Sequence, residues 1–164
     1  MAICHDDSKR FEILNQGLQT LNDLGVTYGD LRAVDRDQEW IQLRNDDVDN
    51  MWRKSDCGFG VRALVGNAWG YAASPTLSVE QVIQCAREAA DIAKSETPTA
   101  RRNVDIGLPN PQRGEWRTPC EKDPLDDVSP AEKVATLRAL TQSLRKASSV
   151  RSGEATAHSL RVRT

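Results

Sequence analysis

The chain has 164 residues, with 38% hydrophobic and 28% charged residues and a formal net charge of -2. This length fits one full domain, or a small domain with part of another, and the composition supports a hydrophobic core. The slightly acidic balance gives no bulk electrostatic reason to bind nucleic acid, and no apolar run approaches the roughly 18 residues of a membrane span. We therefore expect a protein that binds neither nucleic acid nor membranes.

The N-terminus has no apolar stretch after basic residues, so the sequence predicts no secretion signal. The cysteines lie far apart and form no C-x-x-C pair, and without an export signal we expect them to remain thiols in the cytoplasm. They are Cys4, Cys57, Cys85 and Cys120.

The first predicted element is an amphipathic helix over residues 8–24, ended by Gly25. We expect its apolar stripe to pack on a sheet. The stripe recurs at spacings of three and four residues and consists of Phe11, Leu14, Leu18, Leu21 and Leu24.

Three strands are predicted next, over residues 28–34, 39–44 and 48–54, from the alternation of apolar and polar residues. The polar runs 35–37 and 45–47 indicate turns between them, because short polar side chains stabilise tight bends. Connections this short predict antiparallel neighbours.

A β-hairpin is predicted over residues 57–73, with Gly66-Asn67 as its two-residue turn. We expect Trp69 and Tyr71 of the return strand to cover the apolar face of the first strand, with Trp69 in the core. Glycines in a strand mark a close approach of other backbone or a ligand, and here they indicate crowded packing. The apolar face consists of Phe59, Val61, Ala63 and Val65, and the glycines are Gly58, Gly60 and Gly70.

A second helix is predicted to begin at Ser78, with Gln81 completing a capping box. Because several residues of its buried stripe are small alanines, this helix can pack closely on a sheet. We therefore expect an α+β fold, a mostly antiparallel sheet of about five strands with helices packed on it. The stripe is Val79, Val82, Ile83, Ala86, Ala90 and Ala93.

Residues 98–128 are rich in proline and predict a linker, in which we expect Trp116 to dock on a neighbouring surface. Ser129 to Glu132 is a complete helix start, and the helix is predicted to run to about Lys146, with a strand after Gly153. We therefore divide the chain into a domain over 1–97, the linker, and the opening of an incomplete second domain over 129–164.

Candidate metal ligands and nucleophiles are few. The two histidines, His5 and His158, belong to no H-E-x-x-H helix, and no C-x-x-C pair accompanies them. These histidines could form a site with Cys4 or Cys57. We instead expect both histidines to be exposed residues near the chain ends, and Cys57 to be a small buried hydrophobic residue. The acidic run Asp46-Asp47-Asp49 lacks calcium-loop spacing and indicates a solvated turn. We expect no catalytic, cofactor-binding or metal-binding residue in this chain.

Tryptophans provide the one candidate interaction surface. Trp40 is out of phase with the apolar residues of its strand, so its ring is expected to face outward. We assign a candidate protein interaction surface to Trp40, Trp52 and Trp116.

Three segments in order resemble the TldD/PmbA family, also called modulators of DNA gyrase. The first is Y-x-D-x-R, formed by Tyr28, Asp30 and Arg32. The second is the hairpin G-F-G-V-R-A-L-V-G-N-A-W-G-Y-A, whose Trp-Gly-aromatic turn is closer to the TldD branch. The third is D-P-L-D-D-V-S-P-A-E-K, before the later helix.

The resemblance implies a longer zinc metallopeptidase whose C-terminal domain holds an HExxxH motif and its zinc. This sequence contains no such motif, so we expect the N-terminal structural and assembly domain of a TldD-type peptidase, inactive by itself. The implied partners are a TldE/PmbA-type subunit or a second copy, with peptide substrate in the full assembly. The alternative is a free-standing, non-catalytic module that docks on a TldE/PmbA-type protein.

Overall fold

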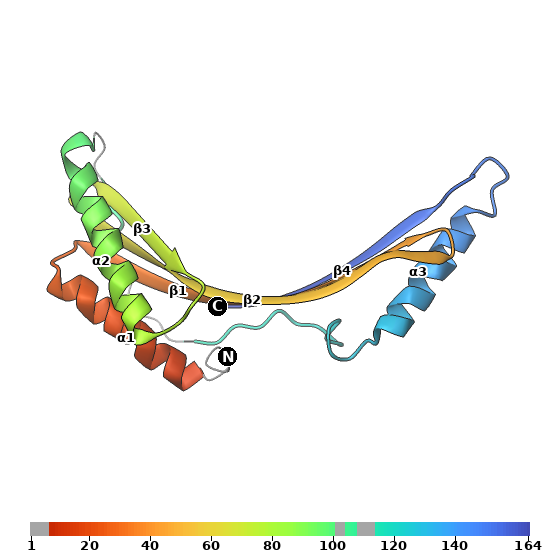
Figure 1. Cartoon of the computed structure of the whole chain (residues 1–164), viewed down its shortest axis with the longest axis horizontal. Coiled ribbons are helices and arrows are strands. Elements are labelled where there is room, and N and C mark those ends of the chain that lie inside the picture. Colours follow the sequence, from red (N-terminus) through yellow and green to blue (C-terminus); the bar gives the residue numbers. More distant parts are fainter. Residues whose placement is uncertain (1–6, 101–103, 108–113) are drawn as a thin grey trace. The chain divides into compact units, whose positions relative to one another are not determined.

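The computed structural model describes residues 7–100, 104–107 and 114–164 (Figure 1). Four strands form one antiparallel sheet in the order β3-β2-β1-β4, and the helices make this an α+β fold, as expected. No helix within the described ranges is long and apolar enough to cross a membrane. The elements are α1 (Asp7–Asp23), β1 (Tyr28–Arg44), β2 (Asp47–Val65), β3 (Ala68–Ser74), α2 (Val79–Glu96), the short 3-10 helix η2 (Thr97–Thr99), α3 (Pro130–Leu144) and β4 (Glu154–Arg163).

The strands are longer and fewer than the predicted five. β1 runs without a break through the predicted turn at 35–37, and β2 joins the predicted third strand to the hairpin. Asp35 and Asp37 are held by ion pairs, from Arg10 at 2.7 Å and from Arg161 at 3.7 Å. Because side-chain partners satisfy these carboxylates, the polar run does not require a bend. The prediction of a turn there is wrong.

The hairpin forms in the predicted register, with Val65 opposite Ala68 across a two-residue turn and Gly66 at a φ of 59°. The face on which each side chain of β3 lies is different from the prediction. Val61 lies opposite Ala72, so the small residues of β3 share the buried face, and Trp69 is 39% exposed on the other. The prediction that Trp69 lies in the core and that its ring covers Val61 is wrong.

The chain divides into two compact units, and each is described by itself. Unit 1 consists of residues 1–35, 57–113 and 164, and unit 2 consists of 36–56 and 114–163. These units describe which residues pack together. The division into 1–97, 98–128 and 129–164 stays a prediction.

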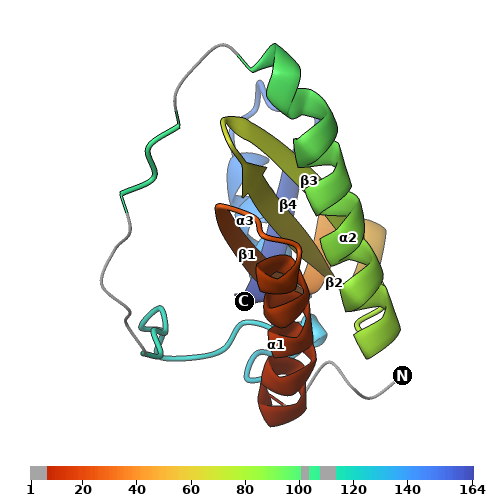
Figure 2. The same ribbon diagram turned by 90° about the vertical axis from the view of Figure 1, so that its left-hand side faces the viewer.

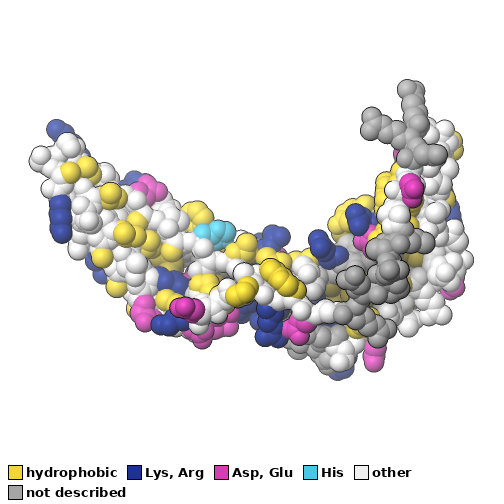
Figure 3. Space-filling view, turned by 180° about the vertical axis from the view of Figure 1, so that it is seen from behind, with side chains coloured by type: hydrophobic (Ala, Val, Ile, Leu, Met, Phe, Trp, Pro, Cys, Tyr) yellow, Lys and Arg dark blue, Asp and Glu magenta, His cyan; other side chains and the backbone are white. Residues whose placement is uncertain are grey.

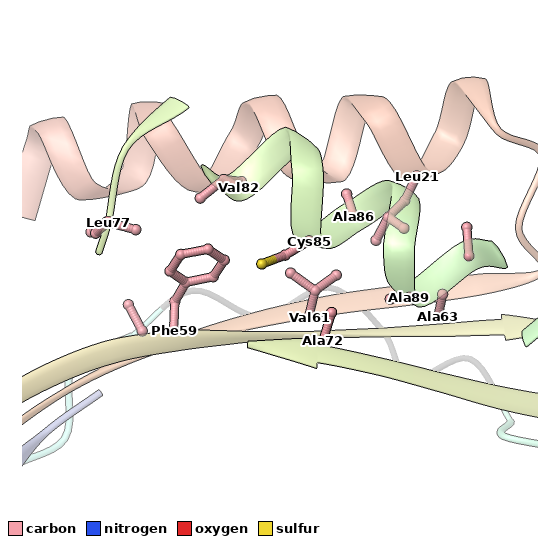
Figure 4. Close-up of a cluster of buried hydrophobic side chains, with 12 residues drawn as sticks. Leu21, Phe59, Val61, Ala63, Ala72, Leu77, Val82, Cys85, Ala86 and Ala89 are labelled. Carbon is pink, nitrogen blue, oxygen red and sulfur yellow. The ribbon is translucent and has the colours of Figure 1, made fainter. Parts of the chain in front are cut away.

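The core of unit 1 lies between α1, α2 and one face of the strands (Figures 2 and 4). Figure 4 shows Phe59 and Val61 pointing from β2 toward Cys85 and Val82 of α2. Alanines let the helix approach the sheet closely, as predicted. Those buried on α2 are Ala86, Ala89, Ala90 and Ala93.

The buried side of α1 is rotated from the predicted stripe. Phe11 and Leu18 are exposed, whereas Gly17 and Leu21 are buried. A Cβ on Gly17 would lie 2.5 Å from a methyl carbon of Val82, so the glycine marks a close approach of α1 to α2. The close contact at Gly17 therefore orients the helix, and the apolar residues Phe11 and Leu18 remain exposed.

In unit 2, α3 packs on one face of the strands. Ile41 and Leu43 of β1 are fully buried against Leu137, and the buried pair Glu39–Lys133 extends the same contact. The predicted helix start is confirmed: Ser129 caps α3 with a complete capping box, and Pro130 is its first residue.

Candidate interaction surface

Unit 2 carries an aromatic patch on the sheet face opposite α3. Trp40 lies between the buried residues Glu39 and Ile41, and neighbouring side chains on a strand point to opposite faces. Its indole stacks on Trp52 of β2, with the ring planes 3° apart and the centroids 6.3 Å apart. The prediction that Trp40 faces outward agrees with this arrangement. Two of the three predicted surface residues are thus brought together.

His158 of β4 completes the patch. Its ring lies 5.4 Å from Trp40, tilted by 53°. Figure 3 shows hydrophobic side chains (yellow) beside a histidine (cyan). Sequence reasoning treated His158 as an exposed end residue and missed this grouping. The sequence did contain a signal for the face on which His158 lies. His158 alternates with the inward-facing residues of a predicted strand, which places it on the opposite face. We call Trp40, Trp52 and His158 the unit 2 aromatic patch.

Apolar side chains continue this face along β4. Leu160 and Val162 follow His158 at alternate positions and are both about half exposed, while Ser159, between His158 and Leu160, is buried. Trp52 itself is 39% exposed. The exposed parts of these side chains offer apolar area to a partner.

Trp116 does not join the patch. It is 81% exposed and makes no ring contact within the described part of the chain. The prediction that it docks on a neighbouring surface is wrong. Leu125 is the residue of this segment that docks, being 4% exposed.

Two arginines hold the turn around Leu125. Arg53 of β2 donates to the carbonyl oxygen of Leu125 at 3.1 Å, and Arg161 of β4 donates to Asp126 at 2.6 Å and also to Asp123. Hydrogen bonds from Arg161 and then Arg53 lower the pKa of Asp126. For Asp123, the amide of Leu125 lowers the pKa most, and Arg161 adds to that effect. The D-P-L-D-D run therefore fastens the segment to the strands of unit 2.

Unit 1 has its own exposed aromatic group, on the face away from α2. Arg62 forms hydrogen bonds to both carboxylate oxygens of Asp30, at 2.7 to 3.0 Å, and its guanidinium lies 5.4 Å from the centre of the Trp69 ring. Tyr28 packs edge-on against Trp69 with centroids 5.9 Å apart. Burial and then the nearby Asp30 raise the pKa of Tyr28. The sequence interpretation missed this group, although Tyr28, Asp30 and Arg62 had been singled out in motifs.

The described residues contain no group of three or more His, Cys, Asp or Glu side chains placed to hold a metal ion. Asp46 pairs with Arg145 at 2.9 Å and Asp49 with Arg44 at 3.5 Å, which fits the predicted solvated turn. The candidate ligands Cys4 and His5 lie outside the described residues. Zinc therefore does not fit the part of the chain that the structure describes.

The fold and these surfaces define an α+β domain with exposed aromatic residues on its sheet faces. Residues 29–93 match the family model described as PmbA/TldA metallopeptidase domain 1. This match covers less than half of the chain and supports the resemblance to the PmbA/TldD family and its N-terminal domain. No curated protein matches the sequence.

Solved structures share the fold. A proposed modulator of DNA gyrase from Bacteroides thetaiotaomicron VPI-5482 has 12% identity and a TM-score of 0.70, with 96% of this chain and 36% of that chain covered. TldE from Thermococcus kodakarensis has 12% identity and a TM-score of 0.58, covering 92% and 34%. A proposed modulator of DNA gyrase from Thermotoga maritima MSB8 has 13% identity and a TM-score of 0.63, also covering 92% and 34%. The chain spans about a third of the length of the structures that it matches.

Proposed function

We propose that this chain is the structural and assembly domain of a TldD-type zinc metallopeptidase that degrades or processes peptides. In this proposal the domain itself performs no hydrolysis, and its task is to associate with a TldE/PmbA-type subunit. The family match supports the peptidase context, and the likeness to TldE supports the kind of partner.

The unit 2 aromatic patch carries the assembly role. Tryptophan is among the residues most enriched at the energetic centres of protein interfaces, because a large rigid ring buries much area and loses little conformational entropy. Trp40 and Trp52 are already held against each other, so docking would order few additional side-chain torsions. Leu160 and Val162 would extend the contact along the same face.

Catalysis is assigned to another part of the assembly. The sequence contains no HExxxH motif, and the described residues offer no metal-binding group. Zinc would then be held outside the residues described here, and no step of peptide hydrolysis is assigned to this chain.

The test is association between the purified chain and the TldE-type subunit of the same organism, measured by sedimentation velocity. The variant Trp52→Ala should weaken binding about tenfold or more, since a central interface tryptophan is worth roughly 2 kcal/mol or more. Trp116→Ala is the matched control: it removes an exposed indole outside the patch and should leave binding unchanged.

Two results would contradict the proposal. One is a complex that Trp52→Ala leaves as tight as the original, with far-ultraviolet circular dichroism showing both proteins folded. The other is chelator-sensitive peptide hydrolysis by the chain alone.

A further inference from the structure

Residues 114–122 form an exposed stretch of chain that precedes the docked turn at Leu125. Every residue from 114 to 122 is exposed, and residues 114–120 belong to no helix, strand or turn. Arg117 pairs with Glu115, two residues earlier, at 2.6 Å, so this ion pair does not tie the stretch to another element. Endopeptidases cut folded proteins in such stretches, because the enzyme must draw several residues of backbone into its cleft. The stretch therefore meets the backbone requirement for cleavage.

One side chain gives this stretch a defined specificity. The four tryptophans, two tyrosines and two phenylalanines of the chain all lie in the described ranges, and all except Trp116 belong to α1, β1, β2 or β3. Trp116 is 81% exposed, so its indole can enter an apolar pocket without any part of the fold opening. Trp52 is also partly exposed, but its backbone belongs to a strand inside the sheet and cannot enter a protease cleft. An endopeptidase with an apolar pocket for the residue before the scissile bond should therefore cut at Trp116 first.

The chain after Trp116 packs on residues 36–56, the other segment of unit 2. Leu137 of α3 is buried in one cluster with Ile41 and Leu43 of β1. β4 adds main-chain pairing, because it lies beside β1 in the sheet. Apolar burial and strand pairing hold two segments together whether or not they are covalently connected. This part of unit 2 therefore does not need the peptide bond after Trp116 to stay in place.

Hydrogen bonds join the same two segments at the turn between β1 and β2. The Asn45 amide donates to the Gly153 carbonyl oxygen at 2.7 Å, and the Gly153 amide donates to the Asn45 side-chain oxygen at 3.0 Å. Arg138 and Arg145 of α3 both donate to Asp46, to its carbonyl oxygen at 3.0 Å and to its carboxylate at 2.9 Å. These polar contacts fix the register in which the later segment lies on the strands.

We propose that the peptide bond between Trp116 and Arg117 is a processing site, cut by an endopeptidase specific for an aromatic residue, and that the cut chain remains folded as a complex of two fragments. Water adds across the bond: the C–N bond breaks, the Trp116 carbonyl carbon becomes a carboxylate, and the Arg117 nitrogen takes up the released proton and becomes an ammonium group. Residues 117–164 then stay on β1 through the contacts described above. The proposal goes beyond the assembly role and does not depend on the unit 2 aromatic patch.

The experiment treats the full chain with a small amount of chymotrypsin and follows the products by intact-mass spectrometry. The first products should be residues 1–116 and 117–164, and gel filtration under native conditions should elute both together at the volume of the uncut chain. Trp116→Gln should slow this cut about tenfold or more, because the aromatic side chain that fills the protease pocket is lost. Phe11→Gln is the matched control: it removes an exposed aromatic ring from helix α1 and should leave the rate unchanged.

Two leucines of α3 test what holds the fragments together. In the cut chain, Leu137→Ala should weaken association of the fragments about tenfold or more, since it truncates a buried side chain at their contact. Leu140→Ala, at an exposed position of the same helix, is the matched control and should leave association unchanged. Sedimentation velocity of the cut chain over a series of dilutions measures both.

Three results would overturn the proposal. They are a first cut elsewhere in the chain, an equal rate of cleavage in Trp116→Gln, and fragments that separate under native conditions at about 10 µM, where a complex of useful affinity stays together. Binding of the TldE-type subunit is judged separately, by the Trp52→Ala measurement on the uncut chain.

Discussion

The carbonyl oxygen of Ala89 in α2 lies 1.8 Å from the point that a Cβ atom on Gly70 of β3 would occupy. The amide nitrogen of Ala93 lies 2.7 Å from the same point. Helix and strand thus meet backbone to backbone, which is possible because residue 70 has no side chain and the facing helix positions are alanines. This contact explains why the aromatic rings of β3 lie on the opposite face.

Gly70→Ala should destabilise the protein by about 3 kcal/mol or more, at the upper end of the range for overpacked cores, because only backbone movement can relieve the clash. Denaturant unfolding followed by circular dichroism measures the loss. Gly114→Ala is the control, since a Cβ there meets no heavy atom of the described residues within 4 Å apart from its chain neighbours, and it should change stability little. Equal stability of the two variants would refute the described packing of α2 on β3.

Breaking the pair Glu39–Lys133 should be costly. The two side chains are only 3% and 8% exposed, so removing either partner leaves a buried charge without its counter-ion. Glu39→Gln or Lys133→Met alone should lower the free energy of unfolding by about 3 to 5 kcal/mol. Replacing both with Leu and Met should cost much less than the sum of the single changes. A double variant as unstable as that sum would show that the pair is not coupled.

Ser129→Ala should shorten α3 from its N-terminus. The Ser129 hydroxyl accepts from the Glu132 amide at 3.2 Å, and the Glu132 carboxylate accepts from the Ser129 amide at 2.8 Å. Losing the cap should cost about 1 kcal/mol. Faster amide exchange confined to the first turn of α3 is the expected readout. Ser129→Asp, which keeps an acceptor, should retain most of the protection.

Acid should release the turn around Leu125. The folded-state pKa values of Asp126 and Asp123 are lowered, so their contribution to stability is present above the usual aspartate pKa and is lost as pH falls through the lowered values. Protonation removes the charge that Arg161 and Arg53 bind. Exchange of the Leu125 amide should therefore accelerate below a pH of about 4, while exchange in α2 stays slow.

Asp126→Asn supplies the control for that measurement. The amide keeps an acceptor oxygen and cannot ionise, so part of the acid dependence should disappear and exchange near neutral pH should already be faster. An unchanged pH profile in Asp126→Asn would assign the acid sensitivity to other carboxylates.

Predictions from sequence patterns were correct where the interactions that determine the structure join residues close in the sequence. The cap of α3, the two-residue turn after Val65 and the alternation around Phe59 follow from nearby residues, and all are present. The same rules placed a turn at residues 35–37. There the deciding partners, Arg10 and Arg161, are distant in sequence, so local polarity gave the wrong result.

The candidate surface was predicted in part. The phase of Trp40 relative to Ile41 indicated an outward ring, and Trp52 was named with it. Strand pairing then decided that these two rings stack, that His158 joins them and that Trp116 does not. None of these relations can be read from spacing, because each joins residues on different elements.

By itself the sequence determined the α+β class, the helix starts, the hairpin register and the resemblance to the PmbA/TldD family, since these depend on periodicity, capping residues and ordered motifs. Only the tertiary structure decided which faces are covered. Gly17 lies close against neighbouring side chains and Gly70 against the backbone of α2, and distant arginines hold a polar run inside a continuous strand. Burial is a property of the elements packed together, so no single segment of the chain contains the information that fixes it.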